Sequence, residues 1–182
     1  SASTGAVYTN EIRYSINDGA NWASSNAVLP FYGHAFVYFK APDGWLYIIG
    51  GDNNNQASLQ TVWRTKDMRT FNVMTTTAGW GTRTLMGGWA DEVSNIYIAG
   101  GQQTTNVQTG PNDIWKSADG GITWNRIANN IHVNGEYFLG QNICNQVKLF
   151  NKRVYVIGDG ISAAAPDDSY SKKVYSASIY DL

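Results

Sequence analysis

The sequence predicts an all-β fold in which two kinds of strand-forming unit repeat along the chain. Three observations predict it: a composition rich in aromatic residues and glycine, a recurring apolar strand that ends in glycine, and a second repeated unit that follows each such strand. The 182 residues include 7 Trp, 11 Tyr and 19 Gly, whereas only 15% are charged. Aromatic side chains pack well on a pleated sheet, and glycine suits the tight turns between strands.

The recurring strands are short apolar runs with tyrosine in second place. Their glycines, Gly50, Gly100 and Gly158, are separated by 50 and then 58 residues. An apolar run of this length, bounded by polar loops, is typical of a strand that is buried on both faces. The three runs are Leu46–Gly51, Ile96–Gly101 and Val154–Asp159.

The second repeated unit is clearest at Asp113–Trp124, and Glu11–Trp22 matches it position by position. A degraded copy at Thr61–Phe71 is one residue shorter, and a fourth copy begins at Lys173. We expect a hairpin in each of the first three copies, because a short polar side chain can accept backbone N–H groups of a turn while the final aromatic ring enters the core. The residues expected to play this structural part are Ser15, Asn17, Gly19, Trp22, Asp67, Phe71, Ser117, Asp119, Gly121 and Trp124.

The pattern Ser-x-Asp-x-Gly-x-Thr-Trp at Ser117–Trp124 resembles the Asp-box, or BNR repeat, of sialidase-type proteins. The Gly-Gly doublets, with Gly33-His34-Ala35 upstream of the first, resemble the kelch repeats of galactose-oxidase-type proteins. This resemblance covers nearly the whole chain. It implies a β-propeller whose blades have four strands, a to d, counted outward from the central axis. It says more about fold than about function.

The blades that the resemblance implies divide the chain into four parts of one propeller segment. Residues 1–30 hold strands c and d of a first blade, 31–78 a second blade, 79–130 a third, and 131–182 an incomplete fourth. Strand a is expected at Ala35–Phe39, Arg83–Gly88 and Ile143–Phe150. These are about 3.5 blades, with strand c at both ends, which favours a segment of a larger propeller. A small closed ring and an assembly of several copies are the alternatives.

Several function classes are disfavoured by composition. A net charge of −1 and a pI near 6.0 argue against nucleic-acid binding, which needs clustered basic residues. No apolar stretch approaches the ~18 residues of a membrane span. The single cysteine, Cys144, allows no internal disulfide. With two histidines and no zinc spacing or phosphate-binding loop, the sequence predicts neither a metal nor a cofactor.

The same residues argue against an enzyme. The sialidase resemblance implies an arginine cluster that clamps a carboxylate, and the six arginines do not form the recognisable motif. We therefore expect a non-enzymatic binding or structural module. A glycan-processing enzyme with its catalytic residues outside this segment, and a structural subunit of an extracellular or viral assembly, are the alternatives. The resemblance favours an extracellular or secretory location.

Surface recognition is the function that the remaining residues favour. Polar loops that follow the glycine-ended strands, and aromatic residues between the expected blades, would share one face of a propeller. Aromatic rings beside amides suit contacts with sugars or with another protein. The partners expected are a glycan or protein ligand, together with the remaining blades or another copy of the chain. The candidate binding residues are Tyr32, Asp52, Asn53, Asn54, Trp80 and Trp89.

Overall fold

The chain folds as an all-β molecule in the computed structural model, which describes residues 9–53, 58–103, 111, 113–129, 132–133, 136–137, 147–157 and 174–178. Every regular element in these ranges is a β-strand, and the strands pair antiparallel. Within the same ranges there is no helix with the length and apolar character needed to cross a membrane. The all-β fold class predicted from the sequence is confirmed.

Two sheets have four strands each, and in both the strands lie side by side in sequence order. Such an order needs no crossover connection, because strands that are neighbours in the sheet pair antiparallel. The second sheet consists of β4 (Val37–Lys40), β5 (Leu46–Ile49), β7 (Val62–Thr65) and β8 (Asn72–Thr75); the third consists of β9 (Gly87–Ala90), β10 (Ile96–Ala99), β11 (Asp113–Ser117) and β12 (Asn125–Asn129).

The remaining sheets are smaller. The first sheet is a hairpin, and the fourth has three strands in sequence order. Two further pairs have strands of two residues each. The first sheet consists of β1 (Glu11–Tyr14) and β2 (Ala23–Val28), the fourth of β15 (Val147–Phe150), β16 (Arg153–Ile157) and β17 (Val174–Ser178), and the short pairs are β3 (Gly33–His34) with β6 (Asp52–Asn53) and β13 (His132–Val133) with β14 (Glu136–Tyr137).

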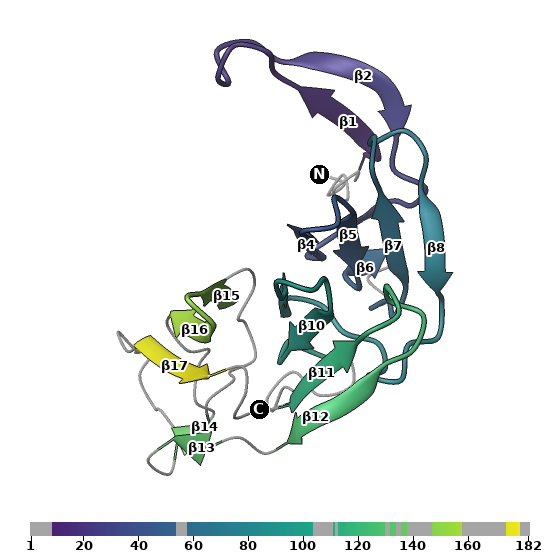
Figure 1. Cartoon of the computed structure of the whole chain (residues 1–182). Helices are drawn as coiled ribbons and strands as arrows, with labels where there is room; N and C mark the ends of the chain where they lie inside the picture. Colours follow the sequence, from purple (N-terminus) through teal and green to yellow (C-terminus); the bar gives the residue numbers. More distant parts are fainter. Residues whose placement is uncertain are drawn as a thin grey trace, which may run out of the picture.

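The four sheets follow one another in sequence order along a curved path (Figure 1). Strands β4 and β15 lie on the concave side of this path, whereas β8 and β12 lie on the convex side. Strand β9 is a neighbour of both β4 and β15. The first strands of the second, third and fourth sheets are therefore gathered on the concave side.

Apolar side chains fill the two spaces between these three sheets. Strand β10 contributes to both spaces: Ile96 and Ile98 pack toward the second sheet, and Tyr97 and Ala99 toward the fourth. All four of these residues are buried. Since successive side chains of a strand point to opposite faces, burial on both faces requires an unbroken apolar run. This explains the composition of the glycine-ended strand.

The inner strands begin later than the sequence predicts. Strand a was expected at Ala35–Phe39 and Arg83–Gly88, whereas β4 begins at Val37 and β9 at Gly87. Ala35 and Leu85 have φ angles of 55° and 54°. This left-handed conformation departs from the extended backbone of a regular strand, and neither residue is part of β4 or β9. Of the third expected strand, Ile143–Phe150, residues 143–146 lie outside the described residues, and β15 covers the rest.

The segment before β9 connects the third sheet to the second instead of extending β9. The N–H of Gly51 donates to the carbonyl of Arg83 at 3.1 Å, and the N–H of Arg83 donates to the carbonyl of Leu59 at 3.0 Å. The N–H of Leu85 donates to the carbonyl of Ala35 at 3.0 Å. These backbone bonds join neighbouring sheets near the end of the glycine-ended strand.

Candidate ligand-binding groove

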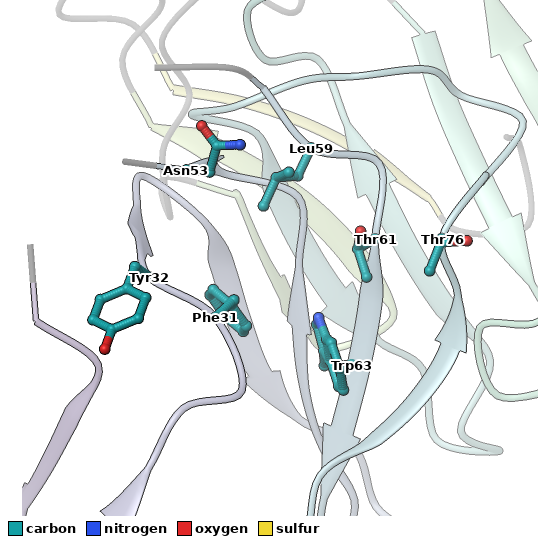
Figure 2. Close-up of a pocket in the computed structure, with 7 residues that line it drawn as sticks. All are labelled: Phe31, Tyr32, Asn53, Leu59, Thr61, Trp63 and Thr76. Atoms are coloured by element: carbon teal, nitrogen blue, oxygen red, sulfur yellow. The ribbon is translucent and has the colours of Figure 1, made fainter. Parts of the chain in front are cut away.

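A groove of about 390 Å³ lies against the second sheet, next to the segment that connects the first sheet to β3. Its volume falls within the ~300–1,000 Å³ that is usual for small-molecule sites. Figure 2 shows residues from the β2–β3 connection on one side and residues of β7 and its flanks on the other. The lining residues are Phe31, Tyr32, Asn53, Leu59, Thr61, Trp63 and Thr76.

Three aromatic rings shape the groove, and two of them fix each other. The rings of Phe31 and Trp63 are stacked, with centroids 6.1 Å apart and planes at 26°. Phe36 also contacts Phe31, in an edge arrangement with the ring centroids 5.8 Å apart. Tyr32 is not among these ring pairs and is 50% exposed. The fixed pair therefore forms a wall, while Tyr32 presents a ring to solvent.

The polar residues of the groove are an amide and two hydroxyls. Asn53 lies at the end of β6 and pairs with Gly33 of β3. Thr61 precedes β7, and Thr76 follows β8. An amide offers two donors and an acceptor, and each hydroxyl can donate and accept. The groove thus combines apolar ring surface with groups that can bond to ligand hydroxyls.

No charged side chain lines the groove within the described part of the chain. Arg64 follows Trp63 on β7, but adjacent strand residues point to opposite faces. The Arg64 guanidinium accordingly lies over the ring of Trp45, 4.3 Å from its centroid. The chemistry of the groove is therefore aromatic and neutral.

The structure brings two of the predicted binding residues, Tyr32 and Asn53, together in this groove. Asp52 lies outside its lining: the carboxylate accepts a hydrogen bond from Ser58 at 2.8 Å and is 4.0 Å from Nε2 of His34. Asp52 therefore holds the β3–β6 region together. Asn54, the fourth residue predicted in this region, lies outside the described residues.

Trp80 and Trp89 do not offer the surface rings expected of them. Both are buried. Trp80 makes an edge contact with Trp124 at 6.1 Å in the core between the second and third sheets. Trp89 stacks on Tyr97 at 5.2 Å, facing the fourth sheet. Each ring is enclosed because two sheets meet there, which makes both residues part of the packing between sheets.

Trp63, Leu59, Thr61 and Thr76 were not predicted as site residues. Trp63 lies in the degraded copy of the second repeated unit, where its neighbours point to a structural part. The alternation of side chains along a strand could have identified Trp63. Val62 is buried toward the third sheet, so Trp63 must point to the opposite face of β7. That face is the one next to Phe31 and Tyr32.

The three hairpins of the second repeated unit share one hydrogen-bonding pattern. In the third sheet, the hydroxyl of Ser117 accepts the N–H of Gly121 at 2.9 Å, and Asp119 accepts the N–H of Thr123 at 2.9 Å. In the first sheet Ser15 and Asn17 accept N–H groups in the same way. In the second sheet Thr65 and Asp67 do so. These polar atoms are used inside their own turns.

The turn carboxylates are held in the ionised form. N–H groups of Thr70 and Arg69 lower the pKa of Asp67 from 3.8 to about 2. Burial alone would raise the pKa of Asp119, but bonds from the hydroxyl and N–H of Thr123, and from Ser117, bring it below its usual range. Neither carboxylate carries a proton near neutral pH, so neither is suited to act as a general acid there.

The turns differ in what covers them. The turn of the third sheet packs onto the second: an added Cβ at Gly121 would meet a methyl of Val62 at 2.7 Å. Trp124, which ends this turn, is 8% exposed. Trp22 ends the matching turn of the first sheet and is 63% exposed. The first sheet thus presents a face that its counterpart in the third sheet buries.

The arginines do not assemble a site for a carboxylate. All six lie in described ranges, and five make contacts in separate places. Arg83 is buried, with its guanidinium 2.7 Å from the carboxylate of Asp113. Within the described ranges, no group of three or more His, Cys, Asp or Glu residues is arranged to hold a metal ion. The other four contacts are Arg13 with Glu11, Arg64 with Trp45, Arg126 with Trp115, and Arg153 with Ser176.

Comparison with known proteins shows similarity of fold alone. No family model matches the chain, and no curated protein matches it. Among solved structures, one titled "Structure of YjhT" is similar, with a TM-score of 0.59 and 11% sequence identity. The similarity covers 96% of this chain and 67% of that one. At this identity the similarity concerns the path of the backbone.

Proposed function

We propose that this chain is a β-propeller segment of the kelch and Asp-box kind that works as a non-enzymatic recognition module for glycans. The observation that carries the proposal is the groove of Phe31, Tyr32, Asn53 and Trp63, in which aromatic rings stand beside an amide and hydroxyls. Sugars have apolar C–H faces and polar rims, and such a lining complements both. A glycan ligand also fits the extracellular or secretory location that the resemblance to Asp-box proteins implies.

The repetition of the sheets supports the propeller part of the proposal. The second and third sheets each have four antiparallel strands in sequence order, and the fourth sheet has three strands in sequence order. The first strands gather on the concave side of the curved path (Figure 1). Propeller blades have four such strands, and their first strands line the central axis.

The exposed face at Trp22 supports the proposal that further blades complete the ring. In the third sheet the matching turn is covered by strand β7 of the preceding sheet. The proposed partner of the first sheet is therefore a sheet of the same kind, from the remaining blades of a larger propeller. A second copy of the chain is the alternative source, and a concentration series separates the two.

Glycan binding is tested with an array of immobilised saccharides probed with the labelled protein and with Tyr32→Ala. We expect the protein to bind a subset of saccharides, and Tyr32→Ala to lose about tenfold in affinity, because a ring that stacks on the ligand is removed. Tyr38→Ala is the matched control, since Tyr38 is similarly exposed, at 56%, on β4 and does not line the groove. A protein that binds no saccharide, or equal losses in the two variants, would contradict the proposal.

A further inference from the structure

The lining of the groove also limits the kind of glycan that it can hold. Four of its seven described residues are aromatic or aliphatic: Phe31, Tyr32, Leu59 and Trp63. The other three, Asn53, Thr61 and Thr76, are polar but uncharged. The cation closest along β7, Arg64, is directed to Trp45 on the opposite face.

We infer that the groove binds a neutral saccharide and discriminates against acidic sugars such as sialic or uronic acids. This inference rests on the proposed function and narrows it. A sugar carboxylate placed here would lose hydration without gaining a cation in return, and burial of an unpaired charge is costly. A neutral pyranose loses much less, because Asn53, Thr61 and Thr76 can replace water around its hydroxyls.

Two other ligand classes fit the groove less well. An extended peptide that adds to a sheet needs a free strand edge, but β7 is already paired with β5 on one side and β8 on the other. A nucleotide can stack on aromatic rings, but its phosphate requires cations, and the described residues of the lining include none. Among these ligand classes, a neutral ligand rich in hydroxyls is the one that can contact the rings, the amide and the hydroxyls together.

The geometry of the groove gives its aromatic and polar residues different roles in binding. Phe31 and Trp63 hold each other at 6.1 Å, so they form a rigid wall whose shape is set before the ligand arrives. In Figure 2, Phe31 lies between Tyr32 and Trp63, and the half-exposed ring of Tyr32 is available to stack on a sugar. Asn53, at the upper left in Figure 2, can orient the sugar through hydrogen bonds of its side-chain amide.

The experiment compares matched pairs of methyl glycosides by isothermal titration calorimetry. Each pair is a neutral hexoside and the uronide in which a carboxylate replaces the C6 hydroxymethyl group, in the gluco, galacto and manno series. For at least one pair we expect the neutral member to bind about tenfold tighter or more than its uronide. Its affinity should not change between about 50 mM and about 500 mM salt, because neither this ligand nor any described residue of the lining carries a charge that salt could screen.

A variant with an added cation tests the cause of this preference. Thr61→Lys places an ammonium in the lining, and we expect it to reduce or reverse the preference for the neutral member, with a salt dependence that the unmodified protein lacks. Thr77→Lys, in the exposed residue just after Thr76 and outside the lining, is the matched control and should leave the preference unchanged. Circular dichroism confirms that both variants fold.

The outcomes separate this inference from the proposed function. Uronides that bind as tightly as the hexosides, or tighter, would overturn the neutral-sugar inference while leaving glycan recognition in place. A preference that Thr61→Lys leaves unaltered would place binding elsewhere and would also overturn the inference. A protein that binds no member of any pair and no saccharide on the array would overturn the proposed function itself, and the inference with it.

Discussion

Trp22 and Trp124 occupy the same position in two copies of one turn, and they show what a single residue contributes to this fold. Both indole N–H groups donate to the carbonyl of a turn glycine, Gly19 at 3.1 Å and Gly121 at 3.2 Å. The local bonds are therefore alike. The difference lies in packing: Trp124 contacts Trp80 in the core, whereas Trp22 is mostly in solvent.

Truncation of the two tryptophans should therefore have unequal effects. We expect Trp124→Ala to lower the free energy of unfolding by about 3–5 kcal/mol, because it leaves a large cavity between the second and third sheets. Trp22→Ala should change it by about 0.5 kcal/mol or less. Urea unfolding followed by circular dichroism measures both. Equal losses would mean that the turn bonds, rather than burial, dominate the contribution of this residue.

At the scale of one element, the turn between β7 and β8 should make the stability of the fold depend on pH in acid. The pKa of Asp67 is about 2 in the fold, below its ordinary 3.8, because N–H groups favour the charged carboxylate. A depressed folded pKa contributes stability above the unfolded value, and this contribution is lost as pH falls from 3.8 through about 2. Asp67 therefore contributes less to the free energy of unfolding in that pH range than at neutral pH.

Replacement of this carboxylate by an amide should remove its share of the acid sensitivity. The first turn already has an amide, Asn17, whose Oδ1 accepts the N–H of Asn21 at 2.9 Å. We expect Asp67→Asn to keep the turn and to flatten the loss of stability between pH 3.8 and about 2, measured by urea unfolding at several pH values. The reciprocal Asn17→Asp should steepen that loss. An unchanged slope in both variants would contradict the hydrogen-bonding account.

The elements also show how far the sequence could be read. The strands β5, β10 and β16 and the three hairpin turns were predictable, because apolar runs and turn residues are local signals. The starts of β4 and β9 were not, because the left-handed φ angles at Ala35 and Leu85 serve bonds between sheets. A backbone requirement set by a partner distant in sequence leaves no pattern at the residue that meets it.

The candidate groove was predictable only in part, for a related reason. Tyr32 and Asn53 could be selected as an aromatic and an amide in expected loops. Trp80 and Trp89 passed the same test and proved to be buried, since the sequence does not say which rings a neighbouring sheet covers. Trp63 was not selected from the sequence, because it lies on a strand and the selection considered expected loops. Its role depends on Phe31, which packs on it from another sheet's connection.

The whole molecule is held together by contacts between successive sheets, so its stability should vary along the chain. Strand β10 is buried along its full length, and β5 is nearly so. No residue of β1 or β2 is buried. In a chain of stacked units, each unit is stabilised by its neighbours, and a unit with one bare face opens more readily.

Hydrogen exchange of the 182-residue chain should show this gradient directly. At low protein concentration we expect the amides of β5 and β10 to exchange slowest and those of β1 and β2 fastest, as read by mass spectrometry of peptides. Protection of β1 and β2 equal to that of β10 would contradict the bare face at Trp22. A dilution series then identifies the covering sheet: protection that rises with concentration points to a second copy, and protection that stays low at every concentration favours remaining blades of a larger propeller.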